Sequence, residues 1–122
     1  HSLSPERLLN MVIHLELENF SVLRYEAEST ARYLRKRGIN QQVENELVRF
    51  FRKMAAVAYL HGRDFPRYSE TCLTKIRNLI DAAEKQPQIL LFFDFESWLE
   101  SKVKSKKLKD VYKISEENLI GD

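Results

Sequence analysis

The sequence predicts an all-α fold, an α-α superhelix of antiparallel helix pairs with a closing helix at its C-terminal end. Apolar residues recur every three or four positions through most of the chain, which is the period of an amphipathic helix. Only three Gly and three Pro occur among 122 residues, too few for the many turns of a sandwich or barrel. Two segments about one repeat length apart also match: each has a helix, a polar corner with a Phe (Phe20 or Phe65), and a second helix.

The first two helices have recognisable ends. Ser4 is expected to cap the first helix, with Pro5 in its first turn, and the helix should run to about Glu16. Asn19 or Ser21 should cap the second. Gly38 should end it in the left-handed conformation that glycine adopts readily.

The third helix is expected to pack on two sides. Asn40 should cap it, and two apolar stripes follow on adjoining faces. The first stripe consists of Val43, Leu47, Phe50, Met54 and Val57, and the second of Val48, Phe51, Ala55 and Tyr59.

The fourth helix should start at Asp64 and Pro66 and end before Pro87. A fifth helix is then expected over residues 89–104, although its apolar start alone could also be a buried strand. We expect this helix to cover the last repeat, with Trp98 in the core. Residues 1–113 would then form one helical-repeat domain, a fragment of a longer solenoid, and residues 114–122 a flexible tail.

Two sets of residues resemble known helical-repeat families. Tyr59, Gly62 and Phe65 lie near the corner positions of tetratricopeptide-type repeats, with a Gly-to-aromatic spacing one residue too long. Glu18-Asn19-Phe20, Arg32-Tyr33-Leu34-Arg35-Lys36 and residues 93–102 are similar to the C-terminal region of a group of uncharacterised bacterial helical-repeat proteins. The resemblance implies an α-α superhelix and no known activity.

The residues that could perform chemistry do not form a recognisable site. His14 and Glu18 are four apart, but no further ligand follows at a matching spacing, so neither a metal nor another cofactor is expected. Cys72 lies on an apolar stripe, where a thiol is a small hydrophobe rather than a nucleophile. The single cysteine suits a reducing, cytoplasmic location, and no apolar stretch approaches the length of a membrane span. The protein is therefore not expected to be an enzyme.

The expected function is a non-catalytic protein-interaction or scaffold module that binds a protein or peptide. One helix of each pair lines the concave face of a solenoid, and on this basis the expected contacts are Asn45, Arg49, Arg52 and Lys53. The alternative is a nucleic-acid-binding domain that uses its basic faces and the Lys-rich residues 102–113. We also expect self-association through an apolar N-terminal edge. Its residues are Leu8, Leu9, Val12 and Ile13.

Overall fold

The computed structural model describes residues 3–38, 41–58 and 65–104, and every regular element in these ranges is a helix. The elements are α1 (Pro5–Glu16), α2 (Phe20–Arg37), α3 (Gln42–Val57), α4 (Phe65–Ala82), α5 (Gln88–Phe92) and a last helix over residues 95–104. The all-α prediction is confirmed for these residues. The expectations for Asn40, Asp64, the corner residues Tyr59 and Gly62, residues 105–113 and the tail lie outside the described residues.

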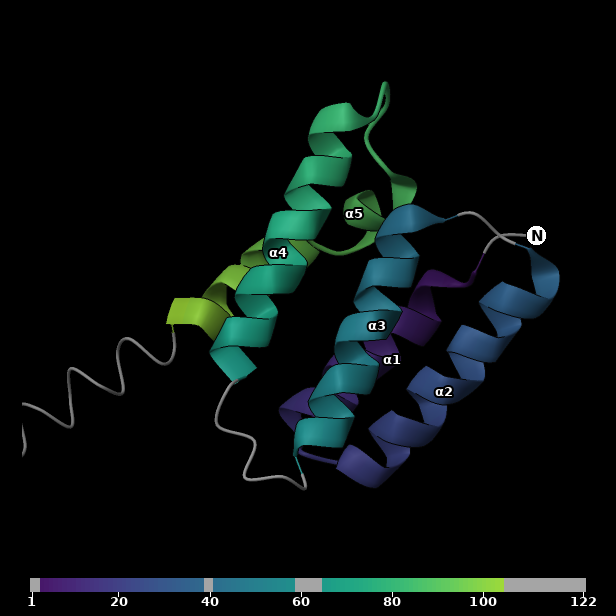
Figure 1. Ribbon diagram of the computed structural model, residues 1–122, viewed down its shortest axis with the longest axis vertical. Helices are drawn as coiled ribbons and strands as arrows, with labels where there is room; N and C mark the ends of the chain where they lie inside the picture. Colours follow the sequence, from purple (N-terminus) through teal and green to yellow (C-terminus); the bar gives the residue numbers. More distant parts are fainter. Residues whose placement is uncertain (1–2, 39–40, 59–64, 105–122) are drawn as a thin grey trace, which may run out of the picture.

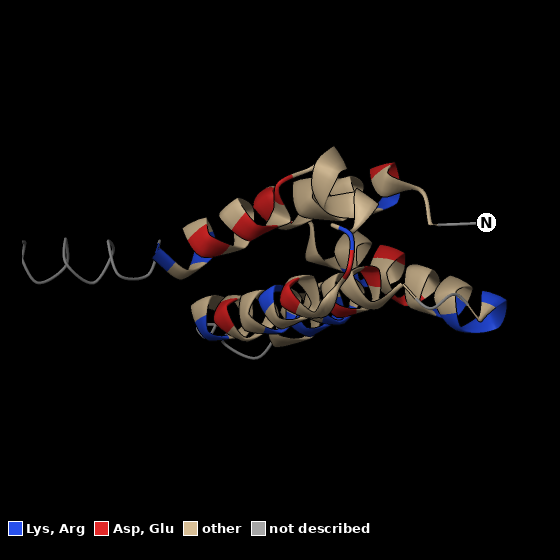
Figure 2. Ribbon diagram, turned by 90° about the horizontal axis from the view of Figure 1, so that it is seen from above, with Lys and Arg blue, Asp and Glu red and all other residues tan. Residues whose placement is uncertain are grey.

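The helices form two layers. Successive helices α1 to α4 run antiparallel, and α2, α3 and α4 lie side by side in one layer (Figure 1). The second layer contains α1, α5 and the 95–104 helix, as Figure 2 shows edge-on. Helix α3 is central, since it packs against α1, α2 and α4. Among the described helices, none is both long enough and apolar enough to cross a membrane.

The ends of α1 and α2 depend on the backbone more than on side-chain caps. Ser4 precedes α1, but its hydroxyl donates to the Glu6 carboxylate and accepts no backbone N–H. Asn19 precedes α2 and likewise makes no side-chain cap. Ser4 and Asn19 therefore occupy the predicted N-cap positions, but neither side chain makes the hydrogen bond of a cap. Gly38 does end α2 in the left-handed conformation (φ 61°), and its N–H bonds to the carbonyls of the preceding turn.

The predicted single helix over residues 89–104 is wrong. The chain breaks after α5, where Phe93 is extended (φ −149°, ψ 138°). Asp94 then caps the 95–104 helix, because one of its carboxylate oxygens accepts the Ser97 N–H at 3.0 Å and the other accepts the Ser97 hydroxyl at 2.7 Å. These bonds lower the pKa of Asp94. The capping interaction turns the last helix onto the core as a separate element.

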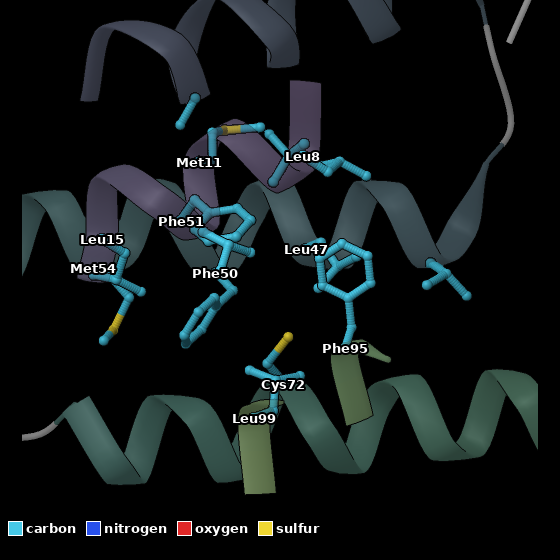
Figure 3. Packing of buried hydrophobic residues seen from close by; sticks show 14 of the residues in the cluster. Leu8, Met11, Leu15, Leu47, Phe50, Phe51, Met54, Cys72, Phe95 and Leu99 are labelled. Atoms are coloured by element: carbon cyan, nitrogen blue, oxygen red, sulfur yellow. The ribbon is translucent and has the colours of Figure 1, made fainter. Parts of the chain in front are cut away.

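The two apolar stripes of α3 are buried, as expected, apart from the half-buried Val57 and the undescribed Tyr59. Phe51 points from α3 toward Met11 of α1, and Phe50 points toward α4 (Figure 3). Phe95 and Leu99 of the last helix are fully buried. This last helix closes the core from the second layer.

Trp98 lies at the margin of the core and not within it. Its ring is partly buried and packs on Phe50 and Phe51, with ring centroids 5.9 and 5.8 Å apart. Its indole N–H donates to the Glu16 carboxylate at 2.7 Å. The expectation that Trp98 is a core residue is therefore confirmed only in part, because its ring packs against the core without being fully buried.

The apolar N-terminal edge is smaller than expected. Leu8 and Val12 are buried and Leu9 is partly buried, since α2 and α3 cover most of α1. Ile13 and Leu17, which are four residues apart, remain 46% and 65% exposed. Self-association through this edge stays a prediction.

Candidate functional site

A groove with a volume of about 890 Å³ crosses the layer of α2, α3 and α4. Helix α3 forms its floor, because this helix lies between the other two (Figure 1). Helices α2 and α4 form the walls. The lining residues are Arg24 and Glu28 of α2, Glu46, Arg49, Phe50, Arg52, Lys53 and Ala56 of α3, and Arg67, Tyr68, Thr71, Cys72 and Lys75 of α4.

The middle of the groove floor is apolar. Phe50 and Cys72 are buried, with 4% and 5% of their surfaces exposed, and each presents one side to the groove. Figure 3 shows them facing each other between α3 and α4. Ala56, one turn beyond Lys53 on α3, is exposed and leaves room above the floor because its side chain is short. The shape of the floor is therefore fixed by the hydrophobic core.

Cys72 is a structural thiol. Its sulfur lies 3.8 Å from the backbone carbonyl of Glu46, to which the thiol donates. Burial raises its pKa to about 12, and the Glu46 carboxylate adds to this effect. The thiolate needed for nucleophilic chemistry is therefore scarce at neutral pH.

Several of the charges that line the groove are paired. The Glu46 carboxylate accepts from Arg49 at 2.9 Å and lies 3.9 Å from the Lys75 ammonium. On the opposite wall, Arg24 and Glu28 form an ion pair at 3.4 Å. These contacts occupy both carboxylates that line the groove.

Three cations, near the C-terminal end of α3 and the start of α4, have no carboxylate partner among the described residues. Arg52, Lys53 and Arg67 are exposed, and no described carboxylate lies within ion-pair distance of them. The Lys53 ammonium and the Arg67 guanidinium instead lie over the Tyr68 ring, 5.2 and 5.3 Å from its centroid. With six basic and two acidic side chains, the groove has a surplus of four positive charges. Basic positions recur along this layer of the molecule (Figure 2).

The structure places three of the four predicted contact residues in this groove. Arg49, Arg52 and Lys53 line it, whereas Asn45 does not. The reasoning from sequence missed the α4 wall, although Arg67, Thr71 and Lys75 step by four residues and so share one helix face. That polar stripe beside the apolar stripe of α4 was the available signal.

Residues outside the groove offer no alternative centre in the described part of the chain. No three of its His, Cys, Asp and Glu side chains are grouped as metal ligands, and the His14 ring lies 3.5 Å from the Asn19 amide. Glu44 is half-buried on α3, and burial raises its pKa, but it does not line the groove.

The Lys-rich segment is described only at its start. Lys102 pairs with Glu16, and Lys104 lies 3.3 Å from Glu100. Partial burial alone would raise the pKa of Glu16, but hydrogen bonds from Lys102 and Trp98 outweigh it, so that the pKa is lowered. The charges of these two lysines are therefore paired with carboxylates of the protein itself. Residues 105–113 lie outside the described ranges.

No protein-family model, curated protein or solved structure matches this chain significantly.

Proposed function

We propose that this chain is a non-catalytic protein-interaction module that holds a protein or peptide partner in the groove between α2, α3 and α4. The observation that supports this proposal is the groove of about 890 Å³, which combines an apolar patch at Phe50, Ala56 and Cys72 with six basic side chains. Concave pockets with an apolar lining and a few placed polar groups are the usual form of binding sites. A tetratricopeptide-like use of stacked helices agrees with this role.

A preformed floor favours binding. Phe50 and Cys72 belong to the core as well as to the groove, so the partner meets a surface that is already ordered. Less conformational freedom is then lost on association. The residues proposed to contact the partner are Arg49, Arg52 and Lys53 of α3.

The absence of catalysis is part of the proposal. Cys72 is the strongest potential nucleophile in the groove, but its raised pKa keeps it protonated. The two groove carboxylates are held in ion pairs with Arg24, Arg49 and Lys75. A single free cysteine also agrees with a cytoplasmic location.

Selection from a random peptide display library on the immobilised protein tests the proposal. A matched pair of variants controls for the site: Ala56→Trp fills the groove, and Asn10→Trp adds the same ring to an exposed position on α1. We expect enriched peptides that bind the wild type and Asn10→Trp equally and lose binding to Ala56→Trp. Failure to enrich any peptide, or enrichment that ignores Ala56→Trp, would contradict the proposal.

Nucleic-acid binding is the second candidate, and the surplus of four positive charges in the groove favours it. Such binding weakens steeply with salt because condensed counterions are released. Binding of single-stranded oligothymidylate that falls steeply with salt and is lost in Ala56→Trp would support this candidate over the first.

A further inference from the structure

We infer that the segment recognised by the groove is an acidic, amphipathic peptide, with carboxylates at Arg52, Lys53 and Arg67 and an apolar side chain on the floor beside Phe50. This inference rests on the proposed function and specifies its ligand. It follows from the distribution of charge along the groove, from the contacts of Tyr68 and from the position of the floor.

The charge distribution locates the anionic group of the partner. Glu28 already neutralises Arg24, and Glu46 already neutralises Arg49 and Lys75. Near the C-terminal end of α3 and the start of α4, Arg52, Lys53 and Arg67 face the groove without a described carboxylate partner. These three cations are therefore available to bind an anion. Complementary charge at an interface sets both partner choice and register. A carboxylate of the partner is therefore expected at this end.

Tyr68 prepares two of these cations for binding. Both the Lys53 ammonium and the Arg67 guanidinium lie over its ring, which restricts side chains that would otherwise be mobile. A restricted cation loses less freedom when a carboxylate arrives. The planar guanidinium groups of Arg52 and Arg67 also match the two oxygens of a carboxylate.

The groove floor supplies the apolar contacts with the partner, in addition to the charge contacts. Phe50 and Ala56 offer an apolar surface next to the unpaired cations. From Glu46 to Ala56 the groove follows ten residues of α3, roughly 15 Å at the helical rise. A short peptide that carries an apolar residue beside its acidic ones fits both the length and the chemistry.

The same features disfavour a nucleic-acid strand. A strand carries phosphates along its whole length, and these would pass the carboxylates of Glu28 and Glu46. Single strands also bind through bases stacked on aromatic rings. Tyr68 is half-buried and already covered by two cations, so it leaves little ring for stacking.

Fluorescence anisotropy with defined probes tests the inference. The first probe is a labelled peptide of alternating Glu-Glu and Leu-Leu pairs. Its controls replace every Glu by Lys, or every Leu by Ser. Labelled oligothymidylate is the nucleic-acid probe. We expect the Glu-Leu peptide to bind, each control peptide to bind at least about tenfold more weakly, and oligothymidylate not to compete.

Charge reversal in the protein locates the contact. Lys53→Glu with Arg67→Glu is expected to weaken binding of the Glu-Leu peptide by more than about tenfold. Arg32→Glu with Lys36→Glu reverses two exposed cations of α2 outside the groove and should leave binding unchanged. Arg52→Glu provides a second groove variant, because Arg52 makes no ion pair with a described residue and its reversal should not disturb folding.

The outcomes separate the two proposals. Equal binding of the Lys-Leu peptide, indifference to reversal of the groove charges, or displacement by oligothymidylate would overturn the acidic-peptide inference. If display selection still yields groove-dependent peptides that are not acidic, the interaction function stands and the inference falls. If neither experiment gives groove-dependent binding, both fall.

Discussion

The two sides of α3 have the same helical spacing and opposite roles. On the inner side, Leu47, Phe51 and Ala55 have no exposed surface. Leu47 lies beside Phe95 of the last helix, and Phe51 points toward Met11 of α1 (Figure 3). On the outer side, Arg49, Arg52 and Lys53 are exposed and line the groove. Phe50 lies between the two, in the core and on the groove floor.

On α3, therefore, one side stabilises the fold and the other is available to bind a partner. Burying apolar surface stabilises the fold, whereas exposed cations contribute little to it. Substitutions on the inner side should therefore change the free energy of unfolding. Substitutions on the outer side should change binding alone.

Phe51→Ala should lower the free energy of unfolding by about 3–5 kcal/mol, because it leaves a cavity under α1 and removes ring contacts with Trp98. Urea denaturation followed by far-ultraviolet circular dichroism measures this loss. Phe92→Ala is the matched control, since Phe92 is 46% exposed. Similar losses in the two variants would contradict the central position of Phe51.

Trp98→Ala should cost less, about 2–3 kcal/mol, because the ring is only partly buried and the loss of a fully buried aromatic ring costs about 3–5 kcal/mol. Trp98→Phe keeps the ring packing and loses the bond to Glu16, so its effect should be smaller still. A loss in Trp98→Ala that exceeds the loss in Phe51→Ala would show that the last helix, and not α3, is the main source of stability.

Cys72 of α4, which lies against α3 and lines the groove, should make the free energy of unfolding depend on pH. Its pKa is raised from the ordinary 9.0 to about 12, so its contribution is complete below pH 9 and declines as the pH rises toward 12. Across this range, the unfolding free energy of the wild type should fall more steeply than that of Cys72→Ala. Parallel curves would mean that the thiol is not desolvated.

Arg52→Glu should have the smallest effect on stability, within about 0.5 kcal/mol, because Arg52 is exposed and unpaired among the described residues. The same urea titration checks this expectation. A loss above about 1 kcal/mol would show that the groove cations support the fold, and the division between the two sides would fail.

The parts of the fold that the sequence predicts well are those with a long local pattern. The two stripes of α3 repeat over four turns, and Gly38 has a backbone conformation that few other residues adopt. The break at Phe93 and Asp94 was harder to predict, because the apolar spacing continues across it. Asp94 three residues before Ser97 was the local signal for a new helix start.

The groove was predictable only in part. It is formed by three helices, whereas a local sequence pattern assigns the faces of one helix and does not say how helices pack together. Arg49, Arg52 and Lys53 were predicted from the solenoid model, in which one helix of each pair lines the concave face, and all three line the groove. Asn45, one turn before Arg49, was predicted in the same way and does not line the groove. The approach of Lys53 to Tyr68 depends on the packing of α4 against α3, which no local pattern encodes.

The position of Trp98 gives the molecule an optical reporter. It is the only tryptophan in the chain, and its ring meets the edge of Phe50, which forms part of the groove floor. A ligand that presses on Phe50 changes the surroundings of the indole from the opposite side of α3. Indole emission can therefore follow occupancy of the groove in the unlabelled protein, and the Trp98–Phe50 contact is the route by which the signal arises.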